Sequence, residues 1–339
     1  MVGARAQALP RMAGMNSTSP SGIIDLCVPW HEEFLGQGAD VHAVMRRLKE
    51  NGHAAVFITV AAVDDLAGAV SLCARRIREF RSRPDLYHII RTVDDFADAA
   101  REGKLGIGFH FQGTVPFGRN LDLVWFFHEL GIRHTLLAYN ERTFVGDGCH
   151  EPGDAGLSLY GKAFVREMNR AGMMVDLAHT GERTSLEAIE ASEKPVIVSH
   201  GNARALFDHP RNVSDAVIRG VAASGGVVGV NGVSFFHGAR ADGIIASMVD
   251  HMVHIADLVG IAHVAVGSDF MYLEGSEYKW LKQRSYMYPA GYPPPPWDFA
   301  QPEDLATLGD HMRRRGFSAP DIDRVFGGNF LRVAAEVWK

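Results

Sequence analysis

The chain has 339 residues, of which 47% are apolar, and it carries a formal net charge of −6. This length fits one α/β barrel or two smaller domains, and the charge comes without a long basic run, so we expect no nucleic-acid partner. Three scattered cysteines are too few for a disulfide framework and indicate a reducing compartment. Because no apolar run is long enough to cross a bilayer, we expect a cytoplasmic protein without a membrane partner.

The first 20 residues contain arginines and prolines but no apolar segment of the signal-peptide kind. We therefore predict a flexible tail over residues 1–20. Apolar and helical segments then alternate without a break from Ile23 to Ser268, and the sequence shows no domain boundary in between. This continuity predicts a single domain over residues 21–339.

Eight short apolar or β-branched segments are predicted to be strands, and they lie at residues 22–25, 55–60, 105–111, 134–138, 173–177, 196–198, 226–231 and 263–268. Segments with helical spacing separate most of them, for example from Ser158 as N-cap to Gly172 and from Ile244 to Gly260. Strands that are apolar on both faces and alternate with helices indicate a covered parallel sheet. Eight such units in about 250 residues predict a (β/α)8 TIM barrel.

In a (β/α)8 barrel the catalytic groups gather where the strands end. The residues at or just past the predicted strand ends are Cys27, Pro29, Thr59, Gln112, Tyr139, Asn140, Asp176, His179, His200, Asn231 and Asp269. A single histidine at a strand end is most often a hydrogen-bonded structural residue. His179 and His200 follow adjacent strands, however, and Asp269 follows the last strand, which favours a metal site because imidazole suits Zn²⁺.

At these residues the chain resembles the membrane (renal) dipeptidases, a family of metallopeptidases. The resemblance runs over nearly the whole chain and is carried by ordered motifs, among them Asp176-Leu-Ala-His179, Val198-Ser-His200-Gly-Asn-Ala-Arg204, His209-Pro-Arg-Asn212, Val266-Gly-Ser-Asp269-Phe270 and Gly327-Gly-Asn-Phe-Leu-Arg332. The resemblance implies a (β/α)8 barrel, a homodimer and hydrolysis of dipeptides with two zinc ions. It also implies that His179 and His200 bind one metal, that Arg211 holds the substrate carboxylate and that Asp269 lies near the attacking water.

The chain departs from the family pattern at three positions. The family's His-x-Asp after the first strand falls on Cys27-Val-Pro29, its bridging glutamate falls on Gln112, and its histidine at the tetrahedral intermediate falls on Tyr139. Two divalent ions need anionic ligands to offset their repulsion and to form a bridging hydroxide. Gln112 is neutral and Pro29 has no side-chain donor, so we predict at most one Zn²⁺, held by His179, His200 and either Asp269 or Gln112.

With one ion, Asp269 is the predicted general base, and Tyr139 and Gln112 are expected near the oxyanion. Asn140 and Cys27 are further candidates for substrate contact. A cysteine beside two histidines is either an activated nucleophile or a small buried apolar residue.

Three other residues near the mouth are expected to have structural roles or to be exposed to solvent. His110 shares a strand face with Gln112 and is expected to be a hydrogen-bonded core histidine, with a metal-ligand role as the alternative. His31 and Glu33 form a His-x-Glu shortly after the first strand, but they lie beyond its end and are expected to be solvated.

An aromatic and proline-rich segment over residues 271–300 follows the last predicted strand. It is too long for an ordinary connection, so we predict an ordered loop over the barrel mouth or a subunit contact. Four consecutive prolines, Pro293 to Pro296, favour an extended backbone there. The tyrosines and tryptophans of this segment suit a cationic amine through cation–π attraction, and they equally suit packing between subunits.

The sequence leaves three functions open. The first is a dipeptidase-like hydrolase with one metal ion, acting on an amide bond of a small amino-acid-derived substrate that carries a carboxylate. The second is a metal-free enzyme with other chemistry, such as attack by Cys27. The third is a non-catalytic binding protein for a small zwitterion such as a betaine. All three predict a small-molecule partner.

Overall fold

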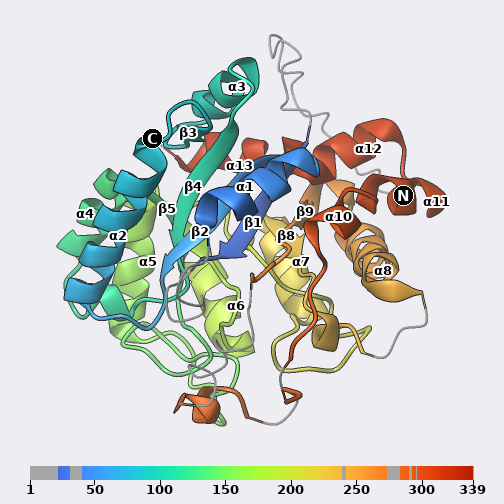
Figure 1. Cartoon of the computed structure of the whole chain (residues 1–339). Coiled ribbons are helices and arrows are strands. Elements are labelled where there is room, and N and C mark those ends of the chain that lie inside the picture. The colour runs from blue at the N-terminus through green and yellow to red at the C-terminus, as the bar shows by residue number, and fades with distance from the viewer. Residues whose placement is uncertain are drawn as a thin grey trace, which may run out of the picture.

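The computed structural model of the protein describes residues 22–30, 40–238, 242–272, 283–289, 292–294 and 296–338. The predicted tail at residues 1–20 and the pair His31 and Glu33 lie outside the described residues. Eight parallel strands form a closed barrel with helices packed around it (Figure 1). The predicted (β/α)8 fold is confirmed.

The barrel strands are β1 (Ile23–Pro29), β2 (His53–Ala61), β4 (Leu105–Phe111), β5 (Ile132–Leu136), β6 (Met174–Asp176), β7 (Ile197–Val198), β8 (Val227–Val230) and β9 (Val264–Val266). Each predicted segment overlaps one of them, and β1 closes the barrel by pairing with both β2 and β9. The sequence pattern does not predict β3 (Tyr87–Ile89), because three residues are too few to show a periodicity. This strand pairs with the first part of β4, and β5 pairs with β4 from Phe109 onward.

The helices around the barrel are α1 (Val41–Glu50), α2 (Leu66–Arg81), α3 (Asp94–Arg101), α4 (Asp122–Leu130), α5 (Leu159–Ala171), α6 (Glu182–Ala191), α7 (Asp215–Ala223), α8 (Gly243–Val259) and α13 (Asn329–Val337). The predicted ends hold, since Ser158 caps α5 by accepting from the Gly161 amide and Gly172 ends it at a φ of 84°. Gly260 likewise ends α8. None of the described helices has the length and apolar character needed to cross a membrane.

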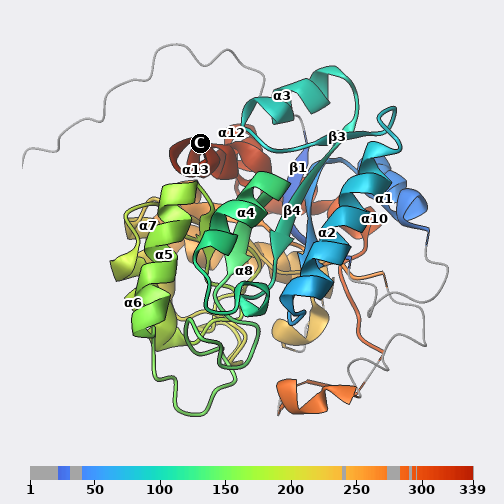
Figure 2. The same cartoon turned by 90° about the vertical axis from the view of Figure 1, so that its left-hand side faces the viewer.

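Shorter elements complete the chain, namely η1 (Val115–Phe117), η2 (Ser234–Phe236), η3 (Ile261–His263), η4 (Ser285–Met287), α10 (Pro302–Leu305), α11 (Leu308–Arg314), α12 (Ala319–Asp323) and the π-helical turn η5 (Arg324–Gly328). Figures 1 and 2 place η4 at the opposite end of the molecule from α13. The two ends of the barrel are therefore covered by different parts of the C-terminal third of the chain.

Aromatic side chains fill the barrel at its α13 end. The ring of Phe57 packs against Phe330 with centroids 5.2 Å apart and against Trp338 at 6.1 Å. Gly108 of β4 leaves room for this ring, because a Cβ there would lie 2.4 Å from it. The interior is thus closed at one end, and polar side chains from the strands are left to face the other.

Candidate active site

Four buried side chains that carry metal-binding atoms meet at the open end of the barrel, and we call these four residues the donors. Nε2 of His179, after β6, lies 3.1 Å from Nε2 of His200, after β7. The ligand atoms of Cys27, His200 and Asp269 all lie within 4.8 Å of one another, and Sγ of Cys27 is 3.7 Å from Oδ1 of Asp269. These four side chains are among the eleven that the sequence predicted at the barrel mouth.

The spacing of the two imidazoles fits a single metal ion. Two nitrogens that bind one zinc at about 2.0–2.1 Å with a tetrahedral angle are roughly 3.3 Å apart. The observed 3.1 Å between the Nε2 atoms of His179 and His200 is close to that value. Neutral imidazole, carboxylate and thiol donors are also groups that suit zinc and similar ions. The residues present therefore fit one divalent ion.

Each of the four donors is fixed by a hydrogen bond to a neighbouring polar side chain. The pairs are Asn140 Oδ1 with His179 Nδ1 at 2.7 Å, Ser199 Oγ with His200 Nδ1 at 2.7 Å, Asn231 Nδ2 with Asp269 Oδ2 at 3.0 Å, and Gln112 Nε2 with Cys27 Sγ at 3.1 Å. Because an amide oxygen only accepts, Nδ1 of His179 carries the proton and its Nε2 presents a lone pair. Outer partners of this kind fix the orientation of metal ligands.

The backbone is strained at the same place. Asn140, His179 and Asp269 have φ values of 62°, 59° and 55°, in the left-handed region that non-glycine residues rarely adopt. Backbone hydrogen bonds hold two of them, from the Asp269 amide to the Cys27 carbonyl at 2.9 Å and from the Cys149 amide to the His179 carbonyl at 2.8 Å. Strain of this kind persists where the surrounding structure enforces it, and it concentrates at functional sites.

Burial dominates the ionisation of the donors. It lowers the pKa values of His179 and His200 well below the usual range, so both imidazoles are neutral. It raises the pKa of the Asp269 carboxyl to about 7, although Arg211 acts in the opposite direction. It also raises the pKa of the Cys27 thiol, and the charge of Asp269 adds to that effect. A bound cation reverses this logic by favouring the deprotonated forms.

Arg211 is buried beside this group, and two of its three side-chain nitrogens have no hydrogen-bond partner among the described residues. Its Nη2 donates to the His200 carbonyl at 2.8 Å, and its guanidinium lies over the ring of Phe236. Nε and Nη1 have no hydrogen-bond partner among the described residues. An unpaired buried cation is unfavourable, and the guanidinium fork matches a carboxylate. Arg211 is therefore suited to bind an anion.

A pocket opens beside the donors and encloses about 400 Å³ free of atoms, part of it solvent. Gln112, Tyr139, His179 and Asp269 line one part of it. The rest of the lining is apolar or aromatic and consists of Pro29, Val233, Phe235, Phe236, Met271, Tyr288, Tyr292, Trp297 and Phe299. The described parts of the aromatic segment at residues 271–300 thus lie at the barrel mouth.

Tyr139 and Asn140 differ in what they contact. The Tyr139 ring lines the pocket, stacks on His179 with centroids 4.3 Å apart, and shares a hydrogen bond of 2.8 Å with the Tyr288 hydroxyl. Asn140 is fully buried, and its amide nitrogen donates to the Met287 carbonyl at 3.0 Å while its oxygen accepts from His179. Both ends of this amide are used within the protein, so Asn140 orients His179 and is not placed to contact a substrate as the sequence suggested.

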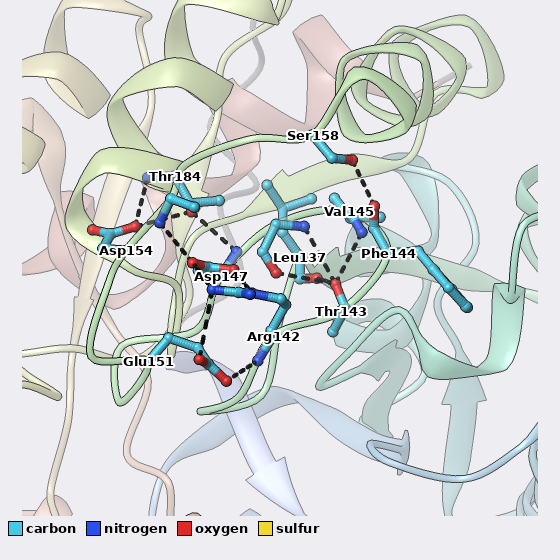
Figure 3. A network of polar contacts seen from close by, with 12 residues as sticks. Leu137, Arg142, Thr143, Phe144, Val145, Asp147, Glu151, Asp154, Ser158 and Thr184 are labelled. Atoms are coloured by element: carbon cyan, nitrogen blue, oxygen red, sulfur yellow. Dashed lines mark hydrogen bonds and ion pairs between the residues drawn. The ribbon is translucent and has the colours of Figure 1, made fainter.

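Tyr139 and Asn140 belong to the long loop between β5 and α5. Figure 3 shows polar contacts within this loop, which the sequence did not predict. Arg142 forms a two-pronged ion pair with Asp147 at 2.6 and 3.0 Å. Asp147 also accepts from the Ala155 amide, and its own amide donates to Thr184 Oγ1 in α6. The loop is therefore tied both to itself and to the start of α6.

The interior below the site is also polar. His110 of β4 and Gln112 just after β4 point to the same side, as expected, because both contact Thr59 Oγ1, at 2.8 and 3.0 Å. Ser199 and Asn231 hold His200 and Asp269, roles that the sequence did not reveal. The available signal was positional, since each of them stands at a strand end.

Comparisons with known proteins agree on one family. The sequence model of membrane dipeptidase (peptidase family M19) matches residues 22–282. Dipeptidase tcpJ of Claviceps purpurea is 28% identical over 284 residues, which are 82% of this chain and 61% of that protein. Dipeptidase aclJ of Aspergillus oryzae is 31% identical over 242 residues, or 69% of this chain and 52% of that protein. The chain thus spans only about half to three fifths of the length of these curated relatives.

Solved structures share the fold. An amidohydrolase from Pseudomonas aeruginosa matches with a TM-score of 0.85 at 29% identity, over 95% of this chain and 98% of that one. A metallopeptidase from Rhodobacter sphaeroides, solved with a phosphinate mimic of the dipeptide L-Ala-D-Ala, matches with a TM-score of 0.77 at 21% identity, over 94% and 100% of the two chains. The second likeness is one of fold alone.

The unused capacity of Arg211 gives a stability prediction with an internal control. Replacing Arg211 by Met in the ligand-free protein should leave the free energy of unfolding unchanged or raise it by about 1–4 kcal/mol, because a buried charge without a full set of partners is removed. Arg133→Met is the control, since buried Arg133 donates to the Arg91 and His128 carbonyls at 2.6 and 2.8 Å. It should lower stability by about 1–3 kcal/mol. Equal losses in urea denaturation would mean that Arg211 is a structural residue.

Proposed function

This chain belongs to the membrane dipeptidase family, and we propose that it is a metallohydrolase that cleaves an amide bond in a small amino-acid-derived substrate with one bound metal ion. The observation that carries the proposal is the group of four buried residues with metal-binding atoms, each fixed by an outer partner. Beside them lies Arg211, whose Nε and Nη1 have no hydrogen-bond partner among the described residues. The names of the relatives support peptide substrates.

A divalent ion held by His179 and His200 would supply Lewis acidity to the amide carbonyl and lower the pKa of a water molecule. Gln112 turns its amide nitrogen, a donor, towards the centre, so Asp269 is the better third ligand of the two that the sequence left open. The second anion at the centre is Cys27 once deprotonated, and Pro29 contributes none. This small number of negative groups supports one ion and not two.

The protein side chains have distinct roles in this proposal. Asp269, fixed by Asn231 through one oxygen, accepts the proton of the attacking water and passes it to the leaving amine, and its pKa near 7 suits both steps. Tyr139 stays protonated because burial raises its pKa, and its hydroxyl would donate to the oxyanion while it accepts from the Tyr288 hydroxyl. Arg211 binds the substrate carboxylate through its free donors.

The aromatic wall supports a second candidate. Tyr288, Tyr292 and Trp297 face the pocket together with Tyr139 and Asp269, which suits an amine or ammonium group opposite Arg211. A non-catalytic receptor for a small zwitterion would use the same two ends. A metal-free enzyme with Cys27 as nucleophile has less support, because this thiol is fully buried, has a raised pKa and does not line the pocket.

One ion per chain is the first expectation. Elemental analysis of protein purified with zinc should give about one equivalent, and His200→Ala should lose both the metal and amide hydrolysis. His254→Ala is the control, because His254 lies on α8 and pairs with Asp215 at 2.8 Å. Zinc affinity should rise between about pH 6 and 8, because protons compete for the Asp269 carboxyl up to its pKa of about 7. Two fully occupied sites, or full activity without metal, would contradict the proposal.

Recognition of the substrate carboxylate is tested by removing it. Dipeptides with an amidated C-terminus should lose about 10²- to 10³-fold in kcat/KM relative to the free acids, because two charge-assisted hydrogen bonds are lost. In Arg211→Met the free acids should fall to the level of the amides, so that the difference between the two disappears. A difference that persists in the variant would show that another residue holds the carboxylate.

The aromatic wall is tested with two ligands of the same shape. Glycine betaine and 3,3-dimethylbutyrate differ only in a positive nitrogen against a neutral carbon. Cation–π attraction should make betaine bind on the order of tenfold more tightly in calorimetry, and Trp297→Leu should reduce that preference. Equal affinities, or no binding of either ligand, would remove the zwitterion receptor from consideration.

A further inference from the structure

We propose that Cys27 is a thiolate ligand of the metal ion. The inference rests on the proposed function in one respect, namely that an ion binds at His200. It goes further by adding a sulfur donor to the centre and by giving this cysteine a role different from substrate contact or nucleophilic attack.

The position of the sulfur fits a ligand. In a tetrahedral zinc site a sulfur at about 2.3 Å and an oxygen or nitrogen at about 2.0–2.1 Å are roughly 3.5 Å apart. Sγ of Cys27 lies 3.7 Å from Oδ1 of Asp269 and within 4.8 Å of a ring nitrogen of His200. The same thiol does not line the pocket. Cys27 can therefore reach the ion, while the substrate space lies beyond it.

The surroundings of Cys27 are those of a ligand and not of a space-filling residue. Gln112 donates its amide N–H to Sγ at 3.1 Å and is itself fixed by a second hydrogen bond to Thr59 at 3.0 Å. Cys73 is also buried, but its environment differs, because burial is the only effect that raises its pKa. Sγ in turn donates its proton to Oδ1 of Asp269 at 3.7 Å, so the Gln112 amide would remain as an outer partner when a metal ion takes the place of that proton.

The thiolate also adds negative charge to a centre that has little of it. Metal binding replaces the thiol proton, which leaves to solvent, by a metal–sulfur bond, so one negative charge is added to the two imidazoles. Cys27, His200 and Asp269, whose ligand atoms lie within 4.8 Å of one another, would then supply three protein ligands and leave an open position. A soft sulfur donor also makes the site prefer Zn²⁺, Co²⁺ or Cd²⁺ to Mg²⁺ or Mn²⁺.

Cobalt provides a direct reading of the ligand. Full-length protein loaded with Co²⁺ should show visible d–d bands and, in addition, a sulfur-to-cobalt charge-transfer band in the near ultraviolet. Cys27→Ser should lose the second band and keep the first, while Cys73→Ser and Cys149→Ser keep both. Cys149→Ser is the more stringent control, because this thiol lies near the site: it donates to Asn140 Oδ1 at 3.5 Å, and the same oxygen accepts from His179. Gln112→Leu should keep both bands and lower zinc affinity about 10- to 100-fold.

The outcomes separate the two proposals. No d–d bands with cobalt would overturn the metal site and the thiolate ligand together. Visible d–d bands without charge transfer, or charge transfer that survives in Cys27→Ser, would overturn the thiolate alone and leave the hydrolase proposal standing. If Cys27→Ser does not fold, zinc X-ray absorption of the wild-type protein decides, since one sulfur at about 2.3 Å is expected and a shell of nitrogen and oxygen only would refute the inference.

Discussion

The centre of this protein depends on the close approach of two imidazole nitrogens, Nε2 of His179 and Nε2 of His200, at 3.1 Å. Burial keeps both rings neutral, and Nδ1 of His179 donates its proton in a hydrogen bond to Asn140 Oδ1. The lone pair of His179 is therefore directed at a proton on His200 or at a cation in its place. A bound cation would also favour the deprotonated forms of Asp269 and Cys27, whose pKa values are raised by burial.

Several features of the surrounding chain accompany this arrangement of the two histidines. Three residues at the mouth keep a left-handed backbone, a buried arginine has donors without partners, and the loop after β5 is tied down by Arg142, Asp147 and Thr184. The left-handed backbone and the unpartnered arginine donors are unfavourable for folding when considered alone. Together they are typical of a preorganised site, in which stability is given up so that binding groups need not rearrange. The apolar packing around Phe57 at the other end of the barrel has no such conflict.

The same fold and family do not by themselves fix the chemistry. Function lies in the residues at the mouth, and here they include a cysteine, a glutamine and a tyrosine. Gln112 contacts the sulfur of Cys27, and Tyr139 stacks on His179 while it faces the aromatic wall. These residues contact one another, so they form a consistent set in which the substrate space, the donors and the outer partners are coupled.

The sequence by itself determined the barrel, because strand and helix periodicities and the caps at Ser158 and Gly172 are local properties, and it placed His179, His200 and Asp269 at strand ends. It did not predict β3, the outer partners or the direction of the Asn140 amide. Those depend on distances between residues far apart in the chain, such as the 242 positions between Cys27 and Asp269. Closure of the barrel by β1 and β9 sets these distances. Only the tertiary structure could decide that Gln112 meets a sulfur and that Arg211 keeps donors for a ligand, since no periodicity records which polar atoms are satisfied by the protein itself.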